Sequence, residues 1–256
     1  MDAAFLEVFC LRLAIGLVMA LLLLPPRQIN PRFHRIQSVI VLGLTTVTVV
    51  LAWSRAESAF FLGIGLAVGA CLLGSVFWSA HASLAAGGSV VLTAAGLLIA
   101  LAGLHTEAGT SASVQLGLAY LIADDLTSSA VLGLATTAML VGHWYLIAPT
   151  MAIDPLIRLI AALAGAVGLR MLTALADMSL ILTGDATLDS LGWLWLALRW
   201  VVGFAGLGIL TVLAWRTARI RSTQSATGIL YVVTIFAFFG ELTAQLLHAH
   251  LAELPQ

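Results

Sequence analysis

Eight long apolar segments follow one another along the chain, separated by short polar stretches. They cover residues 3–25, 35–53, 58–80, 86–105, 127–148, 155–182, 192–215 and 225–248. Each is close to the length of about 20 apolar residues that an α-helix needs to cross a bilayer. Lipid offers backbone N–H and C=O groups no partners, and the alternation typical of a β-barrel is missing, so helices are expected. The pattern predicts an all-α, polytopic integral membrane helix bundle that forms a single transmembrane domain over residues 1–256.

The composition excludes a soluble protein. Hydrophobic residues make up 61% of the chain and charged residues only 9%, against about 25% charged residues in soluble domains. The sequence has no lysine, so a retinal Schiff base is excluded. It also has no Walker or Rossmann glycine loop, no HExxH pair and no GxSxG motif. The main lead to function is therefore the set of charged residues inside the apolar segments.

The arginines outside those segments predict the orientation of the chain. Only Arg55 lies in a loop on the other side. The rest gather in the first and last loops, which an eight-span count places on one side of the membrane: Arg27, Arg32, Arg35, Arg216, Arg219 and Arg221. By the positive-inside rule this is the cytoplasmic side. Both termini are then expected on the outer side, which is the periplasm for a bacterial inner membrane. The charge asymmetry sets orientation and does not indicate binding of nucleic acid.

One polar stretch, residues 106–125, is longer than the other loops. It mixes Gly, Ser and Thr with a short apolar run. We expect either a short interfacial or re-entrant helix or a loop on the outer surface.

Small residues form continuous seams on the third and fourth spans. The third span carries Gly63, Ala67, Ala70 and Gly74, and the fourth carries Ser89, Thr93, Gly96, Ala100 and Gly103. Small side chains allow two helix backbones to approach closely in a membrane. Both seams are therefore predicted to be packing surfaces.

Polar residues form a stripe along one face of the eighth span. The steps of three, four and seven residues place them on one helix face: Thr227, Tyr231, Thr234, Glu241, Gln245 and His248. A stripe that contains a carboxylate does not face lipid favourably. We expect it to face other helices or a wet cavity.

Further charges lie inside the first, sixth and seventh spans. Arg170, Thr173 and Asp177 share a face of the sixth span, Arg199 lies in the seventh, and Arg12 and Glu7 lie in the first. Counting at 1.5 Å per residue places Arg170, Asp177, Arg199 and Glu241 in the outward half of the membrane. One hypothesis is a set of structural ion pairs.

The other hypothesis is a site for a polar or ionisable ligand. In it Glu241 or Asp177 exchanges protons, and Arg170 or Arg199 holds an anionic or carbonyl group. Residues expected to line that site are Arg12, Tyr231, Thr234 and Gln245. No metal ligand set is predicted.

The histidines add two narrower expectations. A membrane haem b needs two histidines on facing helices. His81 with His143 is the only pair near one face, but His81 lies at or beyond a helix end, so haem is not expected. His143 is predicted to be a hydrogen-bonded polar group or a proton relay toward the cytoplasm. His34, beside the first arginine cluster, is expected in a loop at the lipid headgroups.

These observations lead to one preferred function and two alternatives. The eight-span layout with an outward layer of ionisable groups resembles, in topology alone, the quinol-interacting membrane subunits of polysulfide-reductase type. The resemblance implies a membrane subunit of an electron-transfer or energy-coupling complex, with a quinone or proton-relay site. The loops leave no room for a redox domain, so other protein subunits would carry the electrons. The alternatives are a small ion-coupled permease and a non-catalytic scaffold or assembly subunit.

Overall fold

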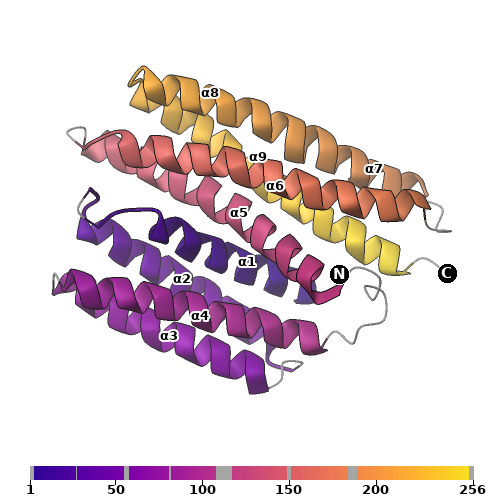
Figure 1. The fold of residues 1–256 in the computed structure, drawn as a ribbon, viewed down its shortest axis with the longest axis horizontal. Coiled ribbons are helices and arrows are strands. Elements are labelled where there is room, and N and C mark those ends of the chain that lie inside the picture. The colour runs from indigo at the N-terminus through magenta and orange to yellow at the C-terminus, as the bar shows by residue number, and fades with distance from the viewer. Residues whose placement is uncertain are drawn as a thin grey trace. The chain divides into compact units, whose positions relative to one another are not determined.

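A computed structural model of the chain is helical (Figure 1). Among the residues that it describes, eight helices are long and apolar enough to cross a membrane. The structure describes residues 3–26, 28–54, 58–80, 82–107, 117–148, 151–183 and 189–253. Within these ranges all regular structure is helical. The predicted class, an all-α polytopic helix bundle, is confirmed, and the protein is an integral membrane protein.

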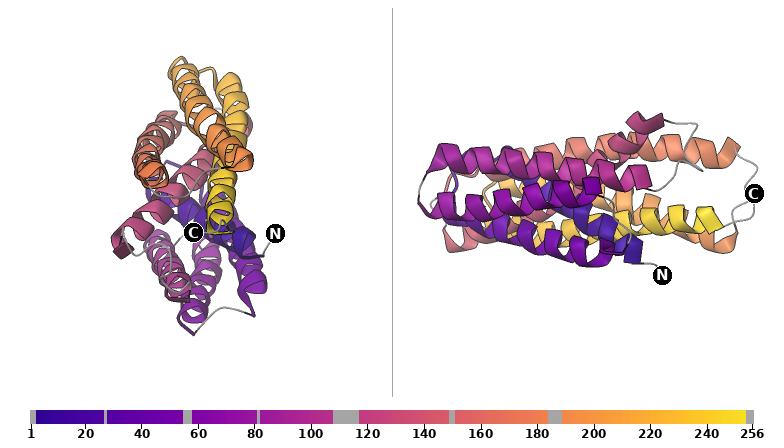
Figure 2. Two further views of the ribbon diagram at one scale, coloured as in Figure 1. Left: turned by 90° about the vertical axis from the view of Figure 1, so that its right-hand side faces the viewer. Right: turned by 90° about the horizontal axis from the view of Figure 1, so that it is seen from below.

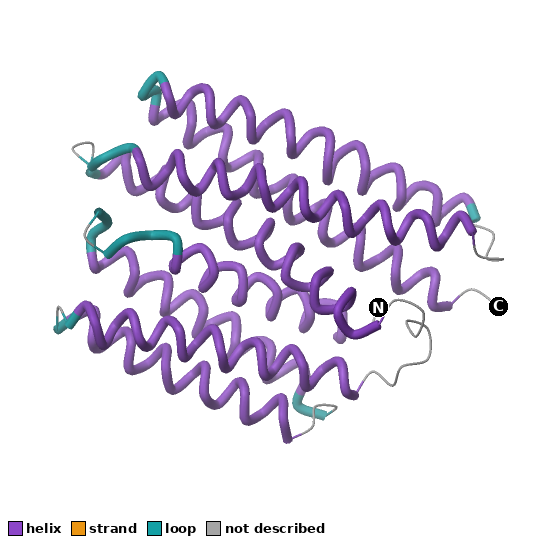
Figure 3. The backbone as a smooth tube through the Cα atoms, viewed as in Figure 1, coloured by secondary structure: helices purple, strands orange, loops and turns teal. Residues whose placement is uncertain are grey.

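The helices follow the predicted spans closely. They are α1 (Ala3–Leu22), α2 (Pro31–Ala52), α3 (Ser58–Ser79), α4 (Ser83–Glu107), α5 (Gly117–Ile147), α6 (Asp154–Thr183), α7 (Ser190–Leu198), η1 (Arg199–Gly206), α8 (Leu207–Arg219) and α9 (Thr223–Glu253). The seventh span is built from α7, the π-helical segment η1 and α8, which run on without a break (Figure 3).

The chain divides into two compact units, Met1–Val114 and Gln115–Gln256. The first contains α1 to α4 and the second contains α5 to α9. Within each unit the helices run side by side along a common direction (Figure 2). This division does not test the prediction of a single transmembrane domain.

The small-residue seams hold α3 against α4 in the first unit. A Cβ atom on Gly96 would lie only 2.6 Å from the backbone nitrogen of Ala67, and a Cβ on Gly103 only 2.8 Å from that of Phe60. Gly63 approaches the backbone of α4 just as closely. The predicted packing surfaces are confirmed. Gly65, on the same helix as Gly63, instead faces open space.

The position predicted for His34 is wrong. Helix α2 begins at Pro31, because proline is well suited to a first helical position and Asn30 caps the helix by accepting from the Arg32 N–H. His34 therefore lies inside α2, is 1% exposed, and stacks on Trp78 with 4.4 Å between the ring centroids. It does not meet lipid headgroups from a loop.

The interpretation of residues 106–125 is also largely wrong. Helix α4 continues to Glu107, and α5 begins at Gly117, ten residues before the predicted start of the fifth span. Residues 108–116 lie outside the described part of the chain. Helix α5 continues through Asp124 and Asp125, both of which are buried. Leaving backbone N–H and C=O groups unpaired in lipid costs more free energy than burying two carboxylates that have partners.

Helices α5 and α9 pack against each other in an antiparallel register. Ser128 contacts Glu241, and the Thr234 hydroxyl donates to the carbonyl of Ala135 at 3.2 Å. Moving seven residues forward along α5, from Ser128 to Ala135, therefore corresponds to moving seven residues backward along α9, from Glu241 to Thr234. The same register places Gln245 level with Asp124, one helical turn nearer the end of the unit where α5 begins.

Candidate functional site

Arg170 is the centre of a buried ionic cluster in the second unit. It projects from α6 and is 1% exposed. Its Nε donates to Glu241 Oε1 and its Nη2 donates to Glu241 Oε2, each at 2.9 Å. Its Nη1 forms a further ion pair with Asp124 and donates to the Thr173 hydroxyl at 3.2 Å. One guanidinium is therefore shared between two carboxylates from two other helices.

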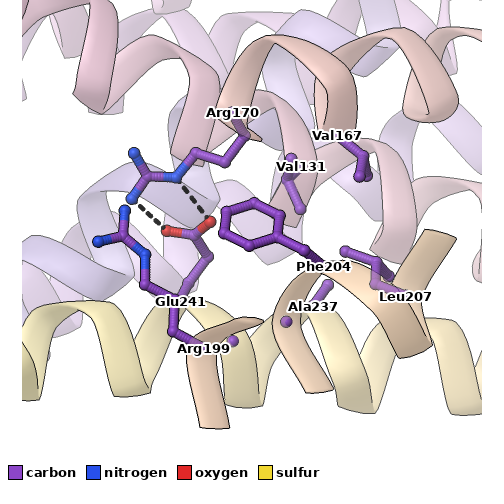
Figure 4. Close-up of a pocket in the computed structure, with 10 residues that line it drawn as sticks. Val131, Val167, Arg170, Arg199, Phe204, Leu207, Ala237 and Glu241 are labelled. Atoms are coloured by element: carbon purple, nitrogen blue, oxygen red, sulfur yellow. Dashed lines mark hydrogen bonds and ion pairs between the residues drawn. The ribbon is translucent and has the colours of Figure 1, made fainter. Parts of the chain in front are cut away.

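Ser128 also binds the Glu241 carboxylate. Its hydroxyl donates to Glu241 Oε2 at 2.7 Å. Ser128 and Asp124 are four residues apart on α5, so both point to one helix face. We refer to Asp124, Ser128, Arg170 and Glu241 as the Arg170 centre. Figure 4 shows the forked contact between Arg170 and Glu241, with Arg199 beside it.

Asp177 organises a second polar group, two helical turns along α6 from Arg170. The Tyr120 hydroxyl donates to Asp177 Oδ1 and also reaches the carbonyl of Thr173 at 3.0 Å. Arg199 Nη2 donates to Asp177 Oδ2 at 3.1 Å. His248 Nε2 lies 3.4 Å from the same oxygen, and its side chain is 43% exposed. Asp177 thus links the buried interior to an exposed histidine near the end of α9.

Pairing explains how these charges tolerate burial. An isolated ionised side chain at mid-bilayer costs roughly 2.5 to 3.5 kcal/mol on insertion scales. In the second unit the buried arginines, Arg170 and Arg199, each bind at least one carboxylate. Removing one member of such a pair typically costs about 3 to 5 kcal/mol in soluble proteins, since a charge is left behind. The cluster therefore fastens α5, α6, η1 and α9 together.

A small cavity lies against the Arg170 centre (Figure 4). It is lined by Arg170, Arg199 and Glu241 on one side and by apolar side chains including Val131, Phe204 and Leu207. Its volume of about 10 Å³ is the space for about one water molecule. A quinone ring does not fit in it in this arrangement of the helices.

The π-helical segment η1 positions Arg199 at this cavity. A wider helical turn is rare and is often found at functional sites. On the same segment Gly203 packs against Gly240 of α9, where a Cβ on Gly203 would lie 2.9 Å from the Gly240 Cα. The two glycines let η1 approach α9 closely, so Arg199 reaches Asp177 and its guanidinium lies 6.0 Å from the centre of the Phe204 ring.

The remaining predicted site residues of the second unit, His143, Tyr231 and Thr234, contact groups outside the Arg170 centre. His143 and Tyr231 contact each other, with 3.3 Å between Nδ1 and the hydroxyl, and both are exposed. Thr234 is buried and bonded to backbone carbonyls. Arg12 belongs to the first unit, and His81 lies outside the described residues.

Gln245 is the one predicted lining residue level with the centre. Its Nε2 and Oε1 atoms are buried and have no hydrogen-bond partner among the described residues.

The sequence analysis missed three members of the network: Tyr120, Asp124 and Ser128. Tyr120 and Asp124 lie before residue 127, where the fifth span was predicted to begin, whereas Ser128 lies inside that span and was not recognised as part of the polar face. Their spacing of four residues was the available signal, since it continues one polar helix face across the supposed boundary.

Together the fold and the site define a polytopic helical membrane protein with a buried network of ion pairs that leads to an exposed histidine. No known family, curated protein or solved structure matches the chain. The topological resemblance noted from the sequence therefore gains no support from these comparisons.

Proposed function

We propose that the protein is an integral membrane subunit of an energy-coupling complex of the bacterial inner membrane, and that its Arg170 centre binds and releases protons. The observation that carries the proposal is the sharing of Arg170 between Asp124 and Glu241. Two carboxylates that compete for one guanidinium form an arrangement that a single proton can switch.

The switch works through the hydrogen bonds of the centre. A proton taken up by Glu241 weakens its forked contact with Arg170, which then relies on Asp124. Ser128, which donates to the Glu241 carboxylate, can rotate its hydroxyl and accept from the protonated form instead. Protonation of Glu241 therefore weakens the attachment of α9 to α6, because charge-assisted hydrogen bonds are about twice as strong as neutral ones.

The cavity favours proton relay over quinone binding at this centre. It admits about one water molecule, which suits a proton and not a quinone ring. An electron-transfer role would then depend on partner subunits that hold the redox groups. Identification of the proteins that co-purify with the chain in mild detergent tests this part of the proposal: a complex without redox or energy-coupling subunits would contradict it.

A static scaffold is the second candidate function. It is favoured by the forked geometry of the Arg170–Glu241 contact, with two bonds of equal length. In that case the carboxylates stay ionised at every pH at which the protein is folded, and the cluster serves only to join the helices.

Infrared difference spectroscopy of the protein in liposomes separates the two candidates. We expect a protonated-carboxyl band that grows as the pH is lowered and is lost in both Glu241→Gln and Asp124→Asn. The control is Asp154→Asn, which changes an exposed carboxylate at the start of α6 and should leave the band intact. A band that is unchanged in both centre variants would overturn the proposal and leave the scaffold.

A further inference from the structure

We propose that protons reach the Arg170 centre from the end of the second unit that carries His248, and not from the opposite end. This inference rests on the proposed function and assigns His248, Asp177 and Tyr120 as the proton-conducting groups. By the arginine distribution this end faces the outer side of the membrane.

Three helices present polar side chains in step from that end toward the centre. On α9 the spacing of His248, Gln245 and Glu241 puts them on one face, and on α6 Asp177, Thr173 and Arg170 do the same. On α5 the matching residues are Tyr120 and Asp124, four residues apart. Polar groups in register on three neighbouring helices form a path and not a single site.

The first steps of the path are direct contacts. His248, which is half exposed, takes a proton from water and lies 3.4 Å from Asp177 Oδ2. Asp177 Oδ1 accepts from the Tyr120 hydroxyl. When Asp177 gains a proton, that hydroxyl can accept from Asp177 and pass its own proton onward, so one proton enters the phenol oxygen as another leaves it.

The last step leads from Tyr120 to Asp124 along the same face of α5. Gln245 lies level with Asp124, and its buried amide has an N–H₂ donor and an oxygen acceptor with no partner among the described residues. We assign this amide to hold one water molecule that passes the proton from Tyr120 to Asp124. Arg170 then carries the effect to Glu241, because it binds both carboxylates.

Charged and titratable groups face the path from α5, α6, η1 and α9. Asp177 faces Tyr120 from α5, Arg199 from η1 and His248 from α9. Arg170 of α6 faces Glu241 of α9 and Asp124 of α5, and the buried Asp125 follows Asp124 on α5. Of these groups only His248 is exposed.

On the other side of Glu241 the polar stripe of α9 is interrupted by residues 235–240, which are apolar or glycine. The cavity beside Glu241 is lined by the apolar side chains of Val131, Val167, Leu207 and Ala237, among others. The next polar side chain of the α9 stripe is Thr234, seven residues away, or about 10 Å along the helix. Its hydroxyl is already bonded to backbone carbonyls. Along α9, protons from that side would have to pass this apolar stretch.

The test is the rate at which the carboxyl infrared band of the Arg170 centre appears after a rapid drop in pH. We expect Tyr120→Phe and His248→Gln to slow the band by roughly tenfold or more, since a positioned acid–base group typically contributes 10²- to 10⁴-fold. Its final amplitude should stay unchanged in both. The matched control is His143→Gln, which alters the histidine–tyrosine pair at the opposite end and should leave the rate unaltered.

The outcomes separate this inference from the proposed function. A band that depends on Glu241 and Asp124, but appears at the wild-type rate in Tyr120→Phe and His248→Gln, overturns the path and leaves the proton centre standing. Slowing in His143→Gln alone would place the access at the other end. A band that does not depend on Glu241 and Asp124 overturns both proposals. Circular dichroism establishes that each variant is folded; if His248→Gln is not, His248→Asn serves in its place.

Discussion

The contact between Arg170 and Glu241 predicts a measurable coupling energy. The perturbation is a double-mutant cycle of Arg170→Met, Glu241→Gln and the combined variant. The pair makes two hydrogen bonds of 2.9 Å, and hydrogen bonds between membrane helices contribute on average about 0.6 and at most about 1.7 kcal/mol each. The expected coupling is therefore about 1 to 3 kcal/mol. The contact of Arg170 with Asp124 is lost in both variants without the arginine, so it cancels from the cycle.

The assay is unfolding of the purified protein in mixed micelles by increasing SDS, followed by far-ultraviolet circular dichroism. A second cycle that pairs Arg170→Met with Asp154→Asn is the control, because the two residues lie 16 positions apart on α6, about 24 Å along the helix, and distant sites add to within about 0.3 to 0.5 kcal/mol. A coupling for Arg170 and Glu241 that does not exceed the control would refute the pairing as described.

Three further predictions concern packing, capping and pH. Gly63→Ala should destabilise the protein by about 1 to 3 kcal/mol through overpacking, whereas Gly65→Ala on the open face of α3 should be neutral or stabilising; SDS unfolding compares them. Arg221 has φ 58° after the end of α8, so Arg221→Gly should raise the unfolding free energy by up to about 1 kcal/mol, and a decrease would argue against the cap. The Gly192 N–H and the His250 ring both form hydrogen bonds with the Asp189 carboxylate, and these bonds lower its pKa. The cap is therefore complete above the ordinary aspartate pKa of about 3.9 and is lost as pH falls through the lowered pKa. The protection factor of the Gly192 amide, which corrects the exchange rate for its intrinsic pH dependence, should fall in acid, but not in Asp189→Asn; a protection factor that is independent of pH in both would count against this cap.

Much of the fold could be predicted from the sequence, because a bilayer leaves few choices. The lengths of the apolar segments predicted the eight spans. The small residues of the third and fourth spans predicted the close contact of α3 with α4 at Gly63 and Gly96. The starts of helices were harder to place. Pro31 extended α2 beyond its apolar segment, and α5 continued through Asp124 and Asp125, where hydropathy alone indicated a loop.

The candidate site could be predicted only in part for the same reason. Arg170 and Glu241 stood out as charges inside apolar helices, and helix periodicity placed Asp177 on the face of Arg170. Asp124 was hidden in the supposed loop, although its contact with Arg170 defines the centre. The π-helical turn that begins at Arg199 depends on how η1 packs against α9 and has no sequence pattern of its own.

The most direct test of the proton centre is the carboxyl carbon of Glu241, observed by solid-state ¹³C NMR in lipid bilayers over the pH range in which the protein stays folded. Glutamate-selective labelling, with Glu241→Gln to assign the signal, makes the resonance identifiable. The account predicts that this signal moves from the ionised to the protonated position within that range, and that it shifts again in Asp124→Asn because the two carboxylates share Arg170. A Glu241 signal that stays at the ionised position at every such pH would contradict it.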